Sequence, residues 1–335
     1  MKLYHRPIIL SEPTRDALSL AGGPCWFREV AIFERNMPSF IAPASDLPAD
    51  ILTRLTAPRA PVAGLNMDRP RIMGILNVTP DSFSDGGDHA GLDSAMAHAR
   101  RMQVDGAEII DIGGESTRPG AVTVPDSEEI SRTSPVIAAI RAQSDIAISI
   151  DTRKAAVAQA AITAGASMVN DVAAFSYDPA LAQVTAQSGL PVCLMHAQGD
   201  PATMQDNPVY EDVLADVYDF LESSVQQAEA AGIARDRIIV DPGIGFGKTE
   251  AHNLILLRHL ALFHSLGCPI LLGASRKRFI GTIGGGDHAK DRMAGSVAVA
   301  LHAATQGVQI LRVHDTFQTK QALALQAAIK GTEIR

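Results

Sequence analysis

From Arg71 onward, short aliphatic, β-branched runs alternate with longer Ala-rich segments, and this alternation constrains the fold more than any other feature. It predicts strands at 72–76, 108–112, 147–151, 168–171, 192–196, 237–241, 269–273 and 310–313. Helices are expected at 92–103, 127–141, 154–164, 178–187, 209–231, 251–266, 292–306 and 319–330. Repeated strand–helix units of this number favour a closed barrel over an open, doubly wound sheet.

Length and composition agree with a barrel. Residues 71–335 match the ~250 residues that a (β/α)8 TIM barrel needs. Hydrophobic residues make up 46% of the chain but aromatic residues only 4%, so the core is built from Ala, Val, Ile and Leu. That composition suits a helix-covered parallel sheet better than an aromatic-rich sandwich. The predicted fold is therefore an α/β, (β/α)8 TIM barrel with an N-terminal extension.

Residues 1–70 lack the strand–helix alternation of the rest of the chain and form the predicted extension. They hold nine of the 19 prolines and the only tryptophan, Trp26. A short strand is expected at 26–35 and one or two helical turns at 48–56. Two interpretations stay open, namely a partly ordered extension that lies on the barrel and a dedicated interaction module. Because neither involves catalysis, we expect removal of residues 1–60 to leave turnover within a few-fold.

Charge and cysteine content exclude several classes of protein. A net charge of −8 argues against a general binder of nucleic acid or of anionic membranes. An anion site must therefore use a few well-placed Arg, Lys and His side chains. The three cysteines are far apart and lack CxxC spacing, which fits a reducing cytoplasm. No signal peptide or long apolar span is visible, so a cytoplasmic protein without a membrane partner is expected.

Polar residues recur where the predicted strands end. In chain order these are Asn77, Asp111, Asp151, Asn170, His196, Asp241, Ser275 with Lys277, and Arg312 with His314. Strand side chains alternate between faces, so Ser149 and Asp151 oppose Ile148 and Ile150, and Arg312 shares a face with His314. One strand-end Asp usually caps a helix or closes a turn. Several converging carboxylates and cations are costly to bury unless a polar ligand fills the space between them, so the joint pattern predicts a site at the barrel mouth.

Seven segments carry a more specific resemblance: NVTPDSFSDGG (77–87), IDIGGESTRPGA (110–121), IDTRK (150–154), VND (169–171), DPGIGFGK (241–248), SRKRFIG (275–281) and RVHD (312–315). Together they resemble the successive motifs of the dihydropteroate synthase family of pterin-binding TIM barrels. That family joins 6-hydroxymethyl-7,8-dihydropterin pyrophosphate to p-aminobenzoate, which gives 7,8-dihydropteroate and pyrophosphate for folate synthesis. The resemblance begins near Arg71 and implies nothing about residues 1–70.

The resemblance implies a role for each matching residue. The pterin would be bound by Asp111, Asp151, Asn170, Asp241 and Lys277. The pyrophosphate would be bound by Thr117, Arg118, Arg312 and His314, and the p-aminobenzoate by Phe83, Pro119, Phe246 and Ser275. Catalysis would rest on Lys277, Arg312 and His314. The implied cofactor is Mg²⁺, which prefers oxygen ligands, with Asn77 as a direct ligand and Asp85 beside it.

Partners and alternatives follow from the same family. The resemblance implies two small-molecule substrates, inhibition by sulfonamides and a homodimer, and it implies no nucleic-acid partner. Two alternatives are a folate-dependent methyltransferase module and a non-catalytic, pterin-binding paralogue. A methyltransferase module does not need the 77–87 motif or the paired cations Arg312 and His314. A paralogue should have lost the loop motifs or Lys277, and this chain retains them.

The glycines of DPGIGFGK invite another interpretation, a nucleotide-binding phosphate loop. The GxxxxGK[ST] pattern requires a glycine five residues after the first one, but the residue five positions after Gly243 is Lys248. We therefore interpret this segment as a turn that carries Phe246.

Overall fold

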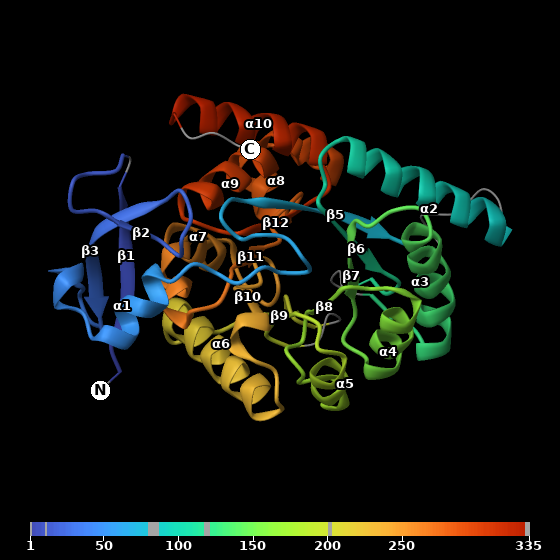
Figure 1. Ribbon diagram of the computed structural model, residues 1–335, viewed down its shortest axis with the longest axis horizontal. Coiled ribbons are helices and arrows are strands. Elements are labelled where there is room, and N and C mark those ends of the chain that lie inside the picture. The colour runs from blue at the N-terminus through green and yellow to red at the C-terminus, as the bar shows by residue number, and fades with distance from the viewer. Residues whose placement is uncertain (1, 11, 80–86, 117–120, 200–202, 332–335) are drawn as a thin grey trace.

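The computed structural model describes residues 2–10, 12–79, 87–116, 121–199 and 203–331, and the side chains of 87–90 lie outside the description. Its centre is a barrel of parallel strands (Figure 1). The strands are β5 (Arg71–Asn77), β6 (Ile109–Gly113), β7 (Ala147–Asp151), β8 (Met168–Asp171), β9 (Val192–Met195), β10 (Ile238–Asp241), β11 (Leu271–Leu272) and β12 (Ile310–Val313). They are ordered β10-β9-β8-β7-β6-β5-β12-β11, and a parallel bridge between Val240 and Ile270 closes the circle. The predicted (β/α)8 barrel is confirmed.

Helices cover the outside of this barrel, as the alternating pattern predicted (Figure 1). They are α2 (Gly87–Val104), α3 (Asp126–Arg141), α4 (Ala155–Ala164), α5 (Ala180–Ser188), α6 (Val213–Ala230), α7 (Glu250–Arg258), α8 (Arg278–Gly284), α9 (Met293–Thr305) and α10 (Thr316–Ile329). The short helix α8 was not predicted. The helix predicted at 251–266 is two pieces, α7 and the 3-10 helix η4 (Leu260–Leu266), separated at His259. Among the described residues, no helix is both long and apolar enough to cross a bilayer.

Two layers of inward-pointing side chains fill the barrel. The lower layer is apolar and takes one residue from each strand: Met73, Ile109, Ala147, Met168, Cys193, Ile239, Leu271 and Ile310. Val62 and Met67, from the segment before β5, pack against this layer and close the bottom of the barrel. Because side chains alternate along a strand, the next inward positions lie two residues further on. Four of these positions hold Asp111, Asn170, Asp241 and Arg312, which form the polar layer discussed below.

The N-terminal extension is an ordered antiparallel sheet. Its strands are β1 (Tyr4–Leu10), β2 (Leu18–Ser19), β3 (Trp26–Phe33) and β4 (Phe40–Pro43), and β3 pairs with all the others. A helix, α1 (Ala49–Thr56), packs beside the sheet. Strand β3 lies where a strand was predicted at 26–35, and α1 lies where helical turns were predicted at 48–56. The sheet has its own small core, which includes Phe27, Val30 and Leu55.

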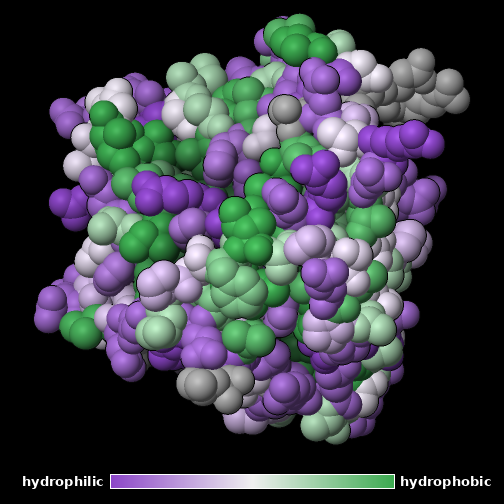
Figure 2. Space-filling view, turned by 90° about the vertical axis from the view of Figure 1, so that its left-hand side faces the viewer, coloured by the Kyte–Doolittle hydropathy of each residue, from purple (hydrophilic) through white to green (hydrophobic). Residues whose placement is uncertain are grey.

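The extension lies against the barrel beside α6 and α7 (Figure 1). The Tyr4 ring stacks on Phe33 at 5.2 Å and meets the edge of Tyr218, on α6, at 5.4 Å. The Cys25 thiol donates to the Ala304 carbonyl at the end of α9 over 3.4 Å. The end of the molecule that carries the extension shows interspersed hydrophobic and hydrophilic patches (Figure 2). The extension therefore lies on the barrel, while the domain boundary at residue 70 stays a prediction.

Candidate active site

An ion network occupies the polar layer above the barrel core. Arg312, on β12, donates from Nε to Asp111 and from Nη2 to Asp151, both over 2.6 Å. Asn170, on β8, donates its amide to Asp111 at 3.3 Å. Two strands thus supply carboxylates to one guanidinium, and a third supplies an amide that bonds one of those carboxylates. The parity argument from the sequence placed Asp151 and Arg312 on the inner face, and the structure brings them together there with Asp111 and Asn170.

Burial controls the electrostatics of this network. Desolvation raises the pKa of the Asp151 carboxyl although Arg312 opposes the shift, and one of its oxygens, Oδ1, is buried without a hydrogen-bond partner among the described residues. The pKa of Arg312 is raised because Asp111 and Asp151 outweigh the cost of burying the guanidinium. A buried carboxylate oxygen without a partner is expensive. The site is therefore suited to a ligand that brings hydrogen-bond donors.

Asp241, at the end of β10, faces the same space. Its Oδ1 accepts from the Gly243 amide over 2.7 Å. Burial raises the pKa of the Asp241 carboxyl to about 6, against the Gly243 hydrogen bond and the charges of Lys248, Lys277 and Arg312. A Cβ built on Gly273 would lie 3.8 Å from Asp241 Oδ2 and 3.7 Å from Arg312 Cδ. Glycine at 273 thus leaves the space between Asp241 and Arg312 open.

The remaining described candidates flank this layer. The Lys277 ammonium lies 3.8 Å from the centre of the Phe246 ring, a cation–π contact between two loops. Ser275 Oγ lies 3.1 Å from His314 Nδ1 and accepts from the His314 amide at 3.2 Å. A Cβ built on Gly113 would lie 3.8 Å from Asn77 Oδ1 and 3.6 Å from Asp151 Oδ2, so both side chains border the space above Gly113. Phe83, Asp85, Thr117, Arg118 and Pro119 lie outside the described residues.

Lys248 is a residue that sequence reasoning missed. Its side chain is buried, and Nζ lies 2.8 Å from His196 Nδ1, 2.9 Å from the Gly243 carbonyl and 3.0 Å from the Phe246 carbonyl. It makes no ion pair with a described residue, and desolvation lowers its pKa well below the usual value. Desolvation also lowers the pKa of His196, to about 2, so the imidazole is neutral. Lys248 therefore ties the loop between β10 and α7 to the end of β9.

Two glycines near Lys248 are required by the conformation and close packing of the β10–α7 loop. Gly243 and Gly247 have φ values of 66° and 61°, in the left-handed region that favours glycine. A Cβ on Gly243 would lie 1.9 Å from the His196 carbonyl oxygen, and one on Gly247 would lie 2.3 Å from that of Gln198. The loop is thus packed against the β9–α6 loop, and the turn interpretation of DPGIGFGK fits better than a phosphate loop.

A second cluster that the sequence did not reveal anchors the loop between β6 and α3. Glu115 accepts from the Val124 amide at 2.9 Å and pairs with Arg153 at 3.2 Å. Lys154 pairs with Glu129 at 2.7 Å and donates to the Val124 carbonyl. These bonds fix both ends of the segment that carries Thr117, Arg118 and Pro119. The pairs join residues 25 to 38 positions apart, a spacing without a local sequence signal.

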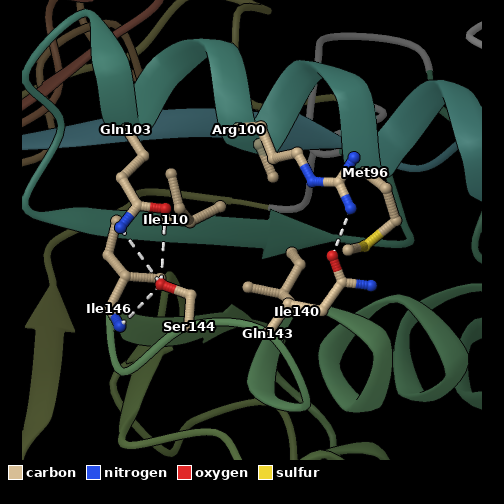
Figure 3. Close-up of a pocket in the computed structure, with 9 residues that line it drawn as sticks. Met96, Arg100, Gln103, Ile110, Ile140, Gln143, Ser144 and Ile146 are labelled. Carbon is tan, nitrogen blue, oxygen red and sulfur yellow. Dashed lines mark hydrogen bonds between the residues drawn. The ribbon is translucent and has the colours of Figure 1, made fainter.

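A small cavity of about 80 Å³ lies elsewhere, between α2 and α3 on the outside of the barrel (Figure 3). Met96, Ile110 and Ile140 form its apolar part, and Gln103 bonds Ser144 at 3.1 Å across its rim. Binding pockets for organic ligands usually measure about 300 Å³ or more. This cavity is therefore a gap in helix packing and does not compete with the mouth as a substrate site.

Comparison with known proteins decides the family. The sequence profile of the family described as pterin binding enzyme matches residues 73–314. Dihydropteroate synthase of Escherichia coli (strain K12) is 47% identical over 273 residues, which cover 80% of this chain and 95% of the relative. The chain belongs to the dihydropteroate synthase family. The family match begins two residues after the start of β5, so the N-terminal extension lies outside it.

Solved dihydropteroate synthase structures have the same architecture. The Xanthomonas albilineans enzyme with 4-aminobenzoic acid is 48% identical, has a TM-score of 0.77, and is matched over 83% of this chain and 100% of its own. The same enzyme in complex with 7,8-dihydropteroate is matched at 45% identity and a TM-score of 0.75, over 82% of this chain and 100% of its own. One of these structures thus contains a substrate and the other a product of the reaction that the family catalyses.

Proposed function

We propose that the protein is a dihydropteroate synthase of folate biosynthesis. It transfers the dihydropterin-methyl group of 6-hydroxymethyl-7,8-dihydropterin pyrophosphate to p-aminobenzoate and releases pyrophosphate. The observation that carries this proposal is the polar layer directly above an apolar barrel core, in which Asp111, Asn170 and Asp241 are buried and Arg312 is partly buried. A polar, flat heterocycle with several donors and acceptors matches that layer.

The pterin ring presents an amino group beside a ring N–H, and a carboxylate can accept both. Asp241 suits this role because only its Oδ1 is occupied by the Gly243 amide. Asn170 and Asp151 complete the recognition of the ring edge, and Asp111 supports them through Arg312. Lys277 donates to the ring carbonyl and N5. Its contact with Phe246 keeps the ammonium at the mouth.

The pyrophosphate requires cations and hydrogen-bond donors at the rim. Arg312 and His314 supply them from β12, and Thr117 and Arg118 complete the anion site. For p-aminobenzoate, the proposed binding residues are Phe246 and Ser275, together with Phe83 and Pro119. Catalysis rests on Lys277, Arg312 and His314.

Magnesium is the proposed cofactor. Among the described residues, no cluster of three or more His, Cys, Asp and Glu side chains could hold a metal ion. Mg²⁺ fits nevertheless, because it keeps several waters and binds substrate phosphates with one or two protein oxygens. Asn77 offers an amide oxygen at the space above Gly113, and Asp85 is the second proposed residue. When bound, the ion supplies positive charge to the leaving pyrophosphate.

The reaction is a substitution at the exocyclic methylene carbon. The carbon–oxygen bond to the diphosphate breaks, and its electron pair leaves with the pyrophosphate, whose charge Arg312 and His314 stabilise. The nitrogen of p-aminobenzoate then donates its lone pair to the methylene carbon, and the new C–N group loses a proton to solvent. Positioning and electrostatic stabilisation perform this chemistry, so no nucleophilic Ser or Cys is needed.

A pyrophosphate-release assay tests the proposal. The purified protein is given the pterin pyrophosphate and Mg²⁺, with and without p-aminobenzoate, and both pyrophosphate and dihydropteroate are measured. A synthase forms both products in equal amounts when p-aminobenzoate is present. A methyltransferase module releases no pyrophosphate, and a non-catalytic paralogue binds the pterin without forming either product.

We also propose that the enzyme acts as a cytoplasmic homodimer. Support comes from α10, where Phe317, Leu325 and Ile329 are 50%, 62% and 77% exposed. At 3.6 residues per turn they fall within about 120° of the helix surface. The buried residues Thr316, Thr319 and Leu323 face the opposite side. An apolar outer face on an otherwise well-packed helix is typical of a subunit interface.

A further inference from the structure

The extension forms ion pairs with acidic residues of helix α6. Arg35, which follows β3, pairs with Asp216 and bonds Asp219 at 2.7 Å. Lys2 pairs with Asp219 and Glu222 further along the helix, and the Tyr4 hydroxyl donates to Asp219 at 2.9 Å. The carboxylates at 216, 219 and 222 lie on one side of α6, so they repel one another unless cations lie between them. The extension supplies those cations.

Arg35 also reaches the loop that precedes α6. Asp216, its partner, accepts from the backbone amides of Glu211 and Asp212 at 3.1 and 3.2 Å. The neighbouring Asn36 donates its backbone amide to the Asp212 carboxylate at 3.4 Å. The turn between β3 and β4 therefore holds the end of the β9–α6 loop from the side of the extension.

That loop is in turn bonded to the β10–α7 loop. The Tyr210 hydroxyl, one residue before Glu211, donates to the Gly247 carbonyl at 2.7 Å. Gln205 donates from its side chain to the Gly245 carbonyl at 2.9 Å. Both acceptors flank Phe246, whose ring lies against the Lys277 ammonium. A continuous series of bonds thus runs from the extension to the mouth of the barrel.

We propose that the N-terminal extension is a positioning element of the active site, and that Arg35 is its positioning residue. Arg35 orders Asp216 and the end of the β9–α6 loop, so Tyr210 and Gln205 hold Phe246 and Lys277 in place for the substrates. This inference rests on the roles proposed above for Phe246 and Lys277. It predicts that removal of residues 1–60, which deletes Arg35 and Asn36, raises the KM for p-aminobenzoate. The expectation that this removal leaves turnover within a few-fold stays a prediction.

A purely structural role for the extension makes a different prediction. In that case any broken contact between the extension and α6 would lower the stability of the whole enzyme and nothing else. Lys2 provides the matched control, because it also pairs with Asp219 on α6 but forms no ion pair or hydrogen bond with the described residues of the β9–α6 loop. The comparison is between Arg35→Met and Lys2→Met in the full-length protein.

Hydrogen exchange and steady-state kinetics separate the two roles. We expect Arg35→Met to speed amide exchange in 205–212 and 243–248 but not in the barrel strand 147–151. The KM for p-aminobenzoate should rise about three- to tenfold with kcat changed less than about twofold, as loss of one charge-assisted contact suggests. Lys2→Met should leave both loops and the KM at the wild-type values. Equal behaviour of the two variants, in exchange and in KM, would overturn the proposal.

A double-mutant cycle tests the pathway itself. Tyr210→Phe removes only the hydroxyl that reaches Gly247, so it should raise the same KM. If Arg35 acts through Tyr210, the double variant is no worse than the more affected single variant. If the double variant instead raised the KM by the product of the two single-variant factors, the pathway would be contradicted. If the wild-type protein made no dihydropteroate, the proposed function would fail, while the exchange comparison would still decide whether Arg35 orders the two loops.

Discussion

The two oxygens of Asp241 have different surroundings, and the pterin assignment depends on that difference. Oδ1 accepts from Gly243, whereas Oδ2 faces the space beside Gly273. Asp241→Asn can keep the bond to Gly243 through its amide oxygen, but it then presents an NH₂ to the pterin amino group. We expect pterin affinity to fall about ten- to a hundredfold, roughly 1.5–3 kcal/mol, with an unchanged melting temperature. Calorimetry that gave wild-type pterin affinity for the variant would refute the assignment.

The same carboxyl predicts a pH dependence. Burial raises the pKa of Asp241 to about 6. Above that pH the group is ionised and accepts two hydrogen bonds, while below it the added proton blocks one acceptor. The affinity for a pterin without its diphosphate should therefore fall about tenfold per pH unit below about pH 6. Fluorescence titrations between pH 5 and 8 would measure this dependence. Asp241→Asn is the control: the part of the slope that Asp241 causes should be absent, while Asp151, whose pKa burial also raises, still titrates.

Strand parity explains why part of the polar layer at the barrel mouth could be predicted. Asp111, Asp151 and Arg312 lie on apolar strands with a period of two, so the sequence indicates which face each side chain takes. The residues that sequence reasoning missed make different contacts. Lys248 binds carbonyl groups of the backbone, which any sequence supplies. No residue pattern therefore marks its partners.

At the scale of elements, the strands were predicted well and the connections less well. The helix predicted at 251–266 ends at Arg258 because the chain turns at His259, with φ −117° and ψ 23°. The segment that follows is completely buried between the barrel and the extension. Tertiary packing decides the 3-10 conformation of this segment. The helical spacing of apolar residues in the sequence cannot show where an α-helix gives way to a 3-10 helix. Helix α8 has only seven residues and lies within a motif that was interpreted for its chemistry.

The β10–α7 loop gives the prediction that belongs to this scale. Lys248→Met keeps most of the side-chain volume but removes the Nζ donor to the carbonyls of His196, Gly243 and Phe246. Unpaired buried acceptors should lower the free energy of unfolding by about 2–4 kcal/mol. The loosened loop should also raise the KM for p-aminobenzoate more than that for the pterin. Denaturant titration and steady-state kinetics would compare Lys248→Met with Lys290→Met, which changes an exposed lysine. Equal stability of the two variants would contradict the role of Lys248 in holding this loop.

At the scale of the whole molecule, the extension was the least predictable part. Its sheet depends on the pairing of β1 with β3, strands more than ten residues apart, and its position depends on Tyr4, Arg35 and their partners on α6. Such pairings depend on the assembled barrel and have no signature in residues 1–70 alone. The barrel was predictable because each strand–helix unit repeats a local pattern, whereas the extension occurs once.

The outer face of α10 predicts the behaviour of the assembled enzyme. If Phe317, Leu325 and Ile329 lie in a subunit interface, Leu325→Asp places a charge in an apolar contact without touching the buried face of the helix. We expect the dimer dissociation constant to rise at least about tenfold, with the monomer still folded. Val104→Asp is the matched control, because Val104 is 79% exposed at the end of α2, on another helix. Sedimentation velocity over a range of concentrations would measure both. A monomeric wild-type protein, or a dimer that tolerates Leu325→Asp as well as Val104→Asp, would show that α10 is not the interface.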